Sequence, residues 1–381
     1  MAYTVNGNLF LQDGNHQAVQ LTESGEDYFA IFSDDGEKIV FCRGDFFCHG
    51  SVYSVNADGS REQALITTDW LTSLGRGTIT GSRAFVPGTH KLLFNTYLCP
   101  NEPEGGSCTT GIFLVDTDTG KIQEFLAPRM VGDLVPHDTF KVSPDGKMVS
   151  VAQSGHIDVF NMDGKLIYRN IMTYIRSTPA ELVPMQYWLS DSSGLIIILP
   201  TKTKFGSAFP NPTYAIRRYL MGGRAVQIPL DNQQPMMMSV GCGDQAPISP
   251  DGNWILYFHE PLLYLGNLRD GHAKTYASGC PCPFWSPDSK HFIYVNENRE
   301  FFLGAINASP IPLSKGTFLE WYDTTHYIYA VSSSSTNGEE NIRIFVGEID
   351  KGIILTYESG IIFHKGYSPW DFINLVQGRS N

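Results

Sequence analysis

The sequence has little positive charge and no long apolar run. Lysine and arginine total 27 against 39 aspartate and glutamate residues, which gives a formal net charge of −12. Nucleic acids and anionic membrane surfaces attract clustered lysine and arginine, so neither is expected as a partner. No segment approaches the roughly 18 apolar residues of a membrane-spanning helix, so we expect no membrane insertion.

Familiar signatures of catalytic sites are also missing. The chain contains no Gly-x-Ser-x-Gly elbow, no P-loop and no dinucleotide fingerprint. His259-Glu260 is followed by Pro-Leu-Leu, which breaks the spacing of a zinc protease. The segments Asp116–Gly120 and Asn56–Gly59 offer oxygen ligands but lack the downstream acid of a calcium loop, so they are predicted to be hairpin turns. We therefore assign no catalytic residue and no cofactor.

The N-terminal segment MAYTVNGNLF lacks the charged and apolar regions of a signal peptide. We expect a cytoplasmic protein, a mature exported chain or an excised domain of a larger chain, and a monomer in each case.

Cysteine spacing favours an exported protein. Among seven cysteines, Cys42 with Cys48 and Cys99 with Cys108 bracket polar loops between strand-like runs, and we predict a disulfide across each loop. Three further cysteines allow one more bridge, and their pairing stays open: Cys242, Cys280 and Cys282. Disulfides would place the chain in an extracytoplasmic compartment, whereas seven reduced thiols in the cytoplasm are the alternative.

What the sequence has in quantity is apolar residues, glycine and proline, arranged in a repeat. Hydrophobic residues make up 42%, with 37 glycines and 22 prolines, so a large core and many turns are expected. An apolar stretch, a Ser-Pro-Asp-Gly-like turn and a second apolar stretch recur seven times, beginning at Phe29, Ser82, Thr139, Gln186, Gln245, Cys282 and Phe318. Most copies are followed by two more strands and another tight turn, which predicts four-stranded antiparallel units.

Such a unit cannot bury both faces alone, so radial stacking into a β-propeller is the predicted fold. Residues 1–22 read as the last two strands of a unit, and residues 361–381 read as the first two. Together they would form one closing blade of a single eight-bladed propeller over residues 1–381. Seven blades, with both terminal hairpins as decorations, is the alternative.

The segments VYSVNADGS and SPDGKMVSV resemble the strand signatures of the TolB-type (WD40-like) propeller repeat, and the resemblance covers nearly the whole chain. That family includes periplasmic scaffold proteins, carbohydrate-associated proteins and the propellers of prolyl oligopeptidase-like enzymes. The resemblance implies an architecture and gives no reaction.

The expected site lies at one end of the blades. In an antiparallel meander, the turn between the first and second strands and the turn between the third and fourth strands lie at the same end of the blade. In this sequence these turns are tight. The long connections fall at the other end of the blades, mostly in the first four blades. Residues entering the first strands would line the channel mouth there: Asp27, Arg83, His137, Asp138, Tyr187, Asp244, Gln245, Glu320 and His364. Loop aromatics at the same end are Phe46, Phe47, Trp70, Tyr174, Phe205 and Phe209.

These residues allow three functions. The first is a non-catalytic recognition module for a protein or polysaccharide, bound through the channel mouth and loop aromatics. The second is a metal-dependent lyase or hydrolase acting on a carbohydrate or peptide-like ligand, with Ca²⁺ or another divalent cation in the channel and His137, His259 and His364 as candidate ligands. The third is a structural spacer whose polar channel residues are merely hydrated.

Overall fold

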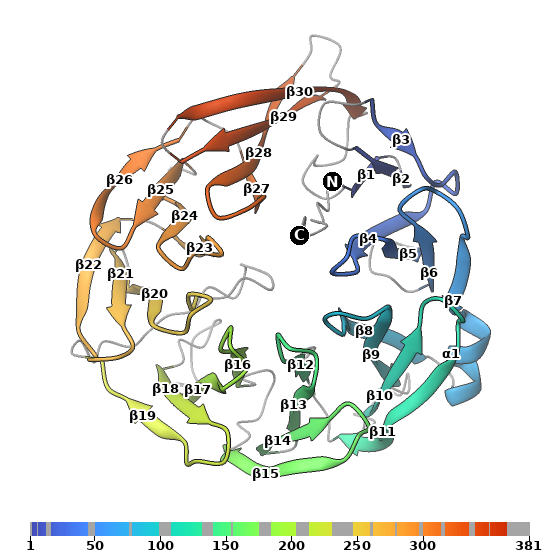
Figure 1. Cartoon of the computed structure of the whole chain (residues 1–381), viewed down its shortest axis with the longest axis horizontal. Helices are drawn as coiled ribbons and strands as arrows, with labels where there is room; N and C mark the ends of the chain where they lie inside the picture. The colour runs from blue at the N-terminus through green and yellow to red at the C-terminus, as the bar shows by residue number, and fades with distance from the viewer. Residues whose placement is uncertain are drawn as a thin grey trace. The chain divides into compact units, whose positions relative to one another are not determined.

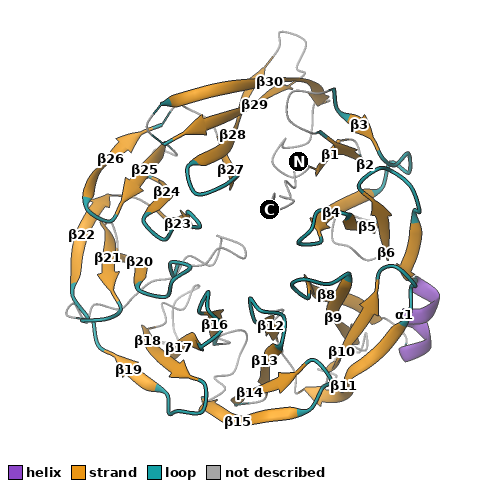
Figure 2. Cartoon of the chain, viewed as in Figure 1, coloured by secondary structure: helices purple, strands orange, loops and turns teal. Residues whose placement is uncertain are grey.

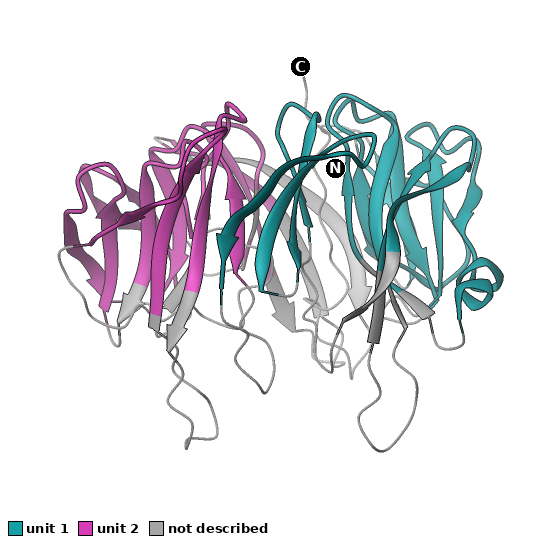
Figure 3. Ribbon diagram, turned by 90° about the horizontal axis from the view of Figure 1, so that it is seen from below, with its two compact units in different colours: residues 1–181, 363–381 teal, residues 182–362 magenta. Residues whose placement is uncertain are grey.

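The computed structural model of the chain describes residues 2–5, 7–12, 17–44, 50–75, 78–98, 108–131, 140–153, 155–174, 184–202, 213–230, 247–259, 262–278, 280–296, 300–313, 317–334, 340–349 and 351–363. The chain divides into two compact units, coloured separately in Figure 3. Unit 1 comprises Met1–Glu181 with Phe363–Asn381, and unit 2 comprises Leu182–Ile362.

Unit 1 consists of short antiparallel strands and one helix (Figure 1). Its elements are β1 (Ala2–Val5), β2 (Asn8–Leu11), β3 (Val19–Gln20), β4 (Asp27–Phe32), β5 (Lys38–Arg43), β6 (Ser51–Asn56), β7 (Gln63–Ile66), α1 (Thr68–Leu74), β8 (Thr78–Phe85), β9 (Lys91–Leu98), β10 (Cys108–Asp116), β11 (Ile122–Val131), β12 (Phe140–Val142), β13 (Met148–Gln153), β14 (His156–Asn161) and β15 (Leu166–Thr173). The strands form four sheets in chain order: β1–β3, β4–β7, β8–β11 and β12–β15.

Unit 2 repeats this plan (Figure 2). Its strands are β16 (Met185–Trp188), β17 (Gly194–Lys202), β18 (Thr213–Leu220), β19 (Val226–Ile228), β20 (Trp254–His259), β21 (Leu262–Asn267), β22 (Ala273–Ser278), β23 (Cys280–Trp285), β24 (His291–Val295), β25 (Phe301–Ala305), β26 (Ala308–Pro312), β27 (Thr317–Trp321), β28 (His326–Ser334), β29 (Glu340–Glu348) and β30 (Gly352–Phe363). They form the sheets β16–β19, β20–β22, β23–β26 and β27–β30. In the β20–β22 sheet, Ile248 bridges Ile255 in place of a first strand.

The recurrent turn motif owes its sequence to hydrogen bonds that close it on itself. In the first copy the Ser33 hydroxyl donates to Asp35 Oδ1 at 2.6 Å and accepts from the Lys38 amide at 3.0 Å. Asp35 Oδ1 also accepts from the Glu37 amide at 3.0 Å, and Gly36 takes a φ of 72°, which glycine tolerates best. The serine and aspartate bonds recur in the turns that begin at Ser143 and Ser249. The predicted turn chemistry is therefore confirmed.

The core of each unit lies between consecutive sheets. Val40 and Val52 of the β4–β7 sheet pack with Leu92 and Phe94 of the β8–β11 sheet, and all four are fully buried. Similar clusters join β8–β11 to β12–β15, β16–β19 to β20–β22, β20–β22 to β23–β26, and β23–β26 to β27–β30. Each sheet thus buries apolar faces against its neighbours along the chain, as the repeat pattern predicts.

The N-terminal sheet differs from the prediction. The predicted hairpin within residues 1–22 exists as β2 and β3, but β1 pairs with the other edge of β2, with Ala2 opposite Leu11. That edge was expected to pair with the C-terminal residues, whereas the structure pairs it with β1. Residues 361–363 belong to β30 and begin no new hairpin. Residues 364–381, on which ring closure depends, lie outside the described residues.

A second difference is helix α1, which falls in a segment expected to be a loop. The Thr67 side chain accepts a hydrogen bond from the Trp70 amide at 3.1 Å and so caps the first turn of the helix. Leu71 is buried in the core between β4–β7 and β8–β11. Among the described residues, no helix is long and apolar enough to cross a membrane.

Three glycines in unit 2 give aromatic or branched side chains room to lie across the sheet. Gly266, Gly304 and Gly347 stand opposite Ile255, Phe292 and Tyr327 on the neighbouring strand. A Cβ at Gly304 would lie 2.3 Å from the Phe292 ring. Because Phe292 is fully buried, its ring has little space into which to move.

We therefore expect Gly304→Ala to lower the free energy of unfolding by about 1–3 kcal/mol through overpacking. Urea denaturation followed by fluorescence measures the change. Gly223→Ala serves as the matched control, because its Cβ meets only the Leu220 carbonyl oxygen at 3.2 Å in an exposed turn. Equal effects of the two substitutions would contradict this account of Gly304.

Candidate functional site

Several predicted site residues lie outside the described residues: Phe46, Phe47, His137, Asp138, Asp244, Gln245, His364, Phe205 and Phe209. Glu320 lies in β27, although its side chain is outside the description. The same holds for Cys108, the first residue of β10, and for His259, the last residue of β20. Their predicted roles stay predictions.

The predicted disulfides stay predictions too. Cys42 is buried and disulfide-bonded. Its proposed partner Cys48 lies outside the described residues, as does Cys99.

Asp27 is fully buried and serves as a structural anchor. It is the first residue of β4, and its two carboxylate oxygens accept from Arg43 Nε at 2.7 Å and from an Arg43 terminal nitrogen at 3.2 Å. Arg43 also pairs with Glu62 at 2.7 Å, and its guanidinium lies 4.3 Å from the Tyr53 ring centre. Burial opposes the charge of Arg43, but bonds to Asp27 and Glu62 outweigh it and raise its pKa. Asp27 therefore fixes the end of β5.

The other described candidates pack against the protein. Trp70 lies on α1, and its ring makes edge contacts with Phe94 at 5.8 Å and with Phe113 at 5.1 Å between ring centres. It therefore joins the core and is not an exposed loop aromatic. Tyr187 packs against the core between β16–β19 and β20–β22. The Tyr174 hydroxyl donates to the Gln153 carbonyl oxygen.

Arg83 lies in β8 and reaches the neighbouring sheet. Its guanidinium contacts the Cys42 sulfur, and burial lowers the pKa of Arg83 to about 10. The contact links β8 to β5.

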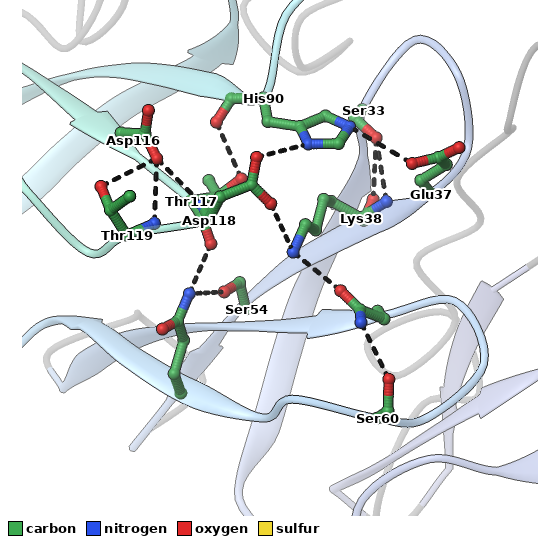
Figure 4. Close-up of polar contacts among 12 residues, drawn as sticks. Ser33, Glu37, Lys38, Ser54, Ser60, His90, Asp116, Thr117, Asp118 and Thr119 are labelled. Carbon is green, nitrogen blue, oxygen red and sulfur yellow. Dashed lines mark hydrogen bonds and ion pairs between the residues drawn. The ribbon is translucent and has the colours of Figure 1, made fainter.

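The clearest described polar cluster lies at the opposite, tight-turn end, between the β4–β7 and β8–β11 sheets (Figure 4). His90, in the turn before β9, lies 2.8 Å from Asp35 through Nε2 and 2.8 Å from Asp118 through Nδ1. Glu37 Oε2 lies 3.8 Å from His90 Nε2. Lys38 Nζ contacts the other Asp118 oxygen at 2.8 Å. We call these five residues the His90 cluster.

Backbone contacts hold the turns of the His90 cluster in place. The Thr117 amide and hydroxyl donate to the His90 carbonyl oxygen at 2.9 and 2.8 Å. The Gly88 amide donates to Asp34 Oδ2 at 3.0 Å, from one sheet to the other. Lys38 Nζ also donates to Asn56 Oδ1 at 2.7 Å. The cluster therefore rests on turns whose relative positions are set by several bonds.

Electrostatics favour a charged imidazole in the His90 cluster. Burial opposes protonation, but hydrogen bonds to Asp118 and Asp35 outweigh it and raise the pKa of His90. The bond from Lys38 is the main cause that lowers the pKa of Asp118. For Asp35, burial raises the pKa, yet bonds from Ser33 and the Glu37 amide lower it overall. The His90 imidazole thus bridges two carboxylates on different sheets.

Sequence reasoning missed the His90 cluster. His90 occupies the turn position that Glu37 and Lys147 hold in other copies of the repeat. The sequence does show a histidine at a turn position and an Asp-Thr-Asp turn further along the chain. No local sequence pattern, however, indicates that the turns of two sheets lie close together.

Repeated four-stranded antiparallel sheets with cores between consecutive sheets define an all-β chain consistent with a β-propeller. Among solved structures, dipeptidyl peptidase 4 from Porphyromonas gingivalis matches with a TM-score of 0.53 at 11% identity, covering 87% of this chain and 53% of that one. An oligogalacturonate lyase in complex with manganese matches with a TM-score of 0.48 at 17% identity, covering 80% and 81%. The oligogalacturonate lyase of Vibrio parahaemolyticus matches with a TM-score of 0.47 at 16% identity, covering 80% and 82%.

At these identities the likeness concerns the fold alone. The chain spans about half the length of the P. gingivalis peptidase it matches. No protein-family model matches the chain, and neither does any curated protein sequence.

The His90 cluster predicts a pH-dependent stability in metal-free protein. Because the folded pKa is raised above the unfolded value of about 6.5, the stabilisation is fully present below about pH 6.5 and is lost as pH rises through the folded pKa. At acid pH the two carboxylates matter instead. The contribution of Asp35 and Asp118 to the free energy of unfolding is present above about pH 4 and is lost as pH falls through their lowered pKa values. We expect His90→Gln to cost up to about 1 kcal/mol at pH 5.5 and less at pH 9.

Urea denaturation at both pH values measures this difference. His272→Gln, at an exposed histidine in the tight turn between β21 and β22, is the control. A cost of His90→Gln that is the same at pH 5.5 and pH 9 would refute the assignment of a charged imidazole.

Proposed function

We propose that the chain is a non-catalytic binding or scaffold β-propeller of an exported or cell-surface protein, and that it recognises a protein or polysaccharide through the end that carries its long connections. In this proposal the repeats are of the TolB type and eight sheets form one ring. The C-terminal residues and the N-terminal sheet would close this ring.

One observation carries the proposal: the two ends of the sheets differ. At one end, the first–second and third–fourth strands are joined by short turns such as residues 33–37, 117–121 and 221–225. At the other end, the chain devotes residues 99–107, 203–212 and 231–246 to connections between strands. Long connections on a rigid scaffold are where recognition usually lies.

Bonds at the same end of the β4–β7 and β12–β15 sheets support the proposal because they anchor the strands there. Asp27 and Arg43 hold the end of β5 where residues 44–50 begin, and the Gly44 amide donates to the Glu26 carbonyl oxygen at 3.0 Å. In the β12–β15 sheet, the buried Asp158 accepts from the Asn170 amide at 2.7 Å and lies 3.4 Å from His156. Rigid bases reduce the entropy lost when loops bind a partner.

The register of β17 and β18 allows a sharp test. Lys202 and Thr213 are directly opposite each other, so an Asn-Gly turn can replace residues 203–212 without shifting the strands. Ser334 and Glu340 allow the same exchange of residues 335–339. We expect both variants to fold, with circular dichroism unchanged, and at least one to lose the binding that wild-type protein shows on arrays of oligosaccharides and peptides.

Arg224→Ala, in the tight turn at the other end of the β16–β19 sheet, is the control and should bind as wild type does. No binding of wild type on either array, or binding lost only in the control, would count against the proposal.

The extracytoplasmic part of the proposal has its own test. Three disulfides among seven cysteines leave one free thiol. We therefore expect one thiol per chain when protein unfolded without reductant is titrated with a thiol reagent. Seven free thiols in protein from an oxidising compartment would overturn the assignment.

A further inference from the structure

We propose that Asp35, Glu37 and His90 bind a divalent transition-metal ion such as Zn²⁺ at the junction of the β4–β7 and β8–β11 sheets. The site lies at the tight-turn end, away from the long connections, so it is separate from the surface proposed above for partner binding.

Three potential ligand atoms already converge. Asp35 Oδ2, Glu37 Oε2 and His90 Nε2 all lie within 4.8 Å of one another, with His90 Nε2 at 2.8 Å from Asp35 and 3.8 Å from Glu37. Zinc takes nitrogen and oxygen ligands at about 2.0–2.2 Å, which places neighbouring tetrahedral ligands about 3.4 Å apart. The observed separations lie on either side of that value. The Glu37 side chain, 72% exposed, is unconstrained enough to adjust.

The opposite side of the imidazole has the support that metal-bound histidines usually have. His90 Nδ1 faces Asp118 at 2.8 Å, and Lys38 Nζ holds the other Asp118 oxygen at 2.8 Å. A carboxylate on one ring nitrogen fixes the proton there and leaves the other nitrogen for the metal. Asp118 and Lys38 thus act as positioning residues.

Asp35 is oriented in the same way. Its Oδ1 accepts from the Ser33 hydroxyl at 2.6 Å and from the Glu37 amide at 3.0 Å, which leaves Oδ2 directed at His90. Ser33 holds the Asp35 carboxylate and Asp118 holds the imidazole, and both lie outside the ligand set, which distinguishes this site from an ordinary group of exposed acids.

The charge balance also favours the ion. Three carboxylates surround the imidazole and Lys38 faces one of them, which leaves two negative charges uncompensated around a neutral imidazole. A divalent ion bound to His90 Nε2 offsets these two charges. Because the ligands come from two sheets, the bound ion also ties these sheets together.

Isothermal titration of chelator-treated protein with ZnCl₂ at pH 8 tests the proposal. We expect Glu37→Gln and His90→Gln each to weaken the strongest binding event at least tenfold, and Asp118→Asn to weaken it about 10- to 100-fold. Glu124→Gln, at an exposed carboxylate of β11 outside the cluster, should bind as wild type does. Wild type should also gain thermal stability on adding zinc, and Glu37→Gln should gain less.

Circular dichroism verifies that each variant is folded. Should His90→Gln fail to fold, Glu37→Gln still decides, because the exposed Glu37 side chain approaches His90 only at 3.8 Å and the backbone bonds of Glu37 are kept in the variant. Zinc affinity unchanged in Glu37→Gln, or lowered equally in Glu124→Gln, would overturn the proposal and assign the binding to other histidines or cysteines.

Discussion

Each four-stranded sheet has two apolar faces, and neither can be buried within the sheet itself. The β4–β7 sheet illustrates the constraint: Phe41 and Ile39 pack toward the β1–β3 sheet, while Val40 and Cys42 pack toward the β8–β11 sheet. Alternate residues of one strand thus belong to different cores. Every interior sheet of a unit therefore needs a neighbour on each side, and chain order supplies it. The alternation of buried apolar residues along each strand follows from this stacking.

Stacking brings the tight turns of neighbouring sheets close together, so their polar groups must be satisfied locally. The Ser-Pro-Asp-Gly turns do so with bonds inside the turn and across to the next sheet. Within unit 2, the Asp251 amide donates to Ser289 Oγ at 2.9 Å, and the Ser286 hydroxyl donates to the Thr324 carbonyl oxygen at 3.1 Å. The residues that shape a turn also bond it to the turn of the neighbouring sheet. This double role explains why the turn motif recurs while the flanking apolar residues vary.

Features with a local cause could be predicted from the sequence, and features with a distant cause could not. The turn at Ser33 and the strands on either side follow from residues adjacent in the chain. Strand β1 was missed because its four residues carry no pattern of their own and depend on pairing with β2. Helix α1 was missed because polar and apolar residues are mixed in its segment, in which the Thr67 side chain caps the first turn. Asp27 was recognised as a notable carboxylate, but its partner Arg43 stands at the far end of the next strand.

The candidate site shows the same limit more strongly. His90, Asp35 and Asp118 come from three turns on two sheets, and each turn alone reads as an ordinary hairpin. Only the packing of the two sheets makes a site of them. Conversely, Trp70 has the character of a binding residue in isolation, yet the helix places it against Phe94 and Phe113.

The junctions between sheets are built from different chemistry in the two units, and this difference bears on the His90 cluster. At two junctions of unit 2, the residue before the turn is a tryptophan whose indole nitrogen donates to the preceding sheet: Trp285 to the Pro247 carbonyl oxygen at 3.0 Å, and Trp321 to that of Phe284 at 2.8 Å. In unit 1 the equivalent positions are Phe32 and Phe85, which have no donor.

The β4–β7 and β8–β11 sheets are joined instead by the charged bridge through His90, nearer the solvent. A hydrogen bond from an indole N–H does not depend on pH or on metal ions. An imidazole between carboxylates can take up a proton and can bind a metal ion. If the bridge served only to join sheets, an aromatic donor at Phe85 would do so at lower electrostatic cost. The use of a titratable, metal-competent group at this junction is therefore the strongest structural reason to look for a ligand there.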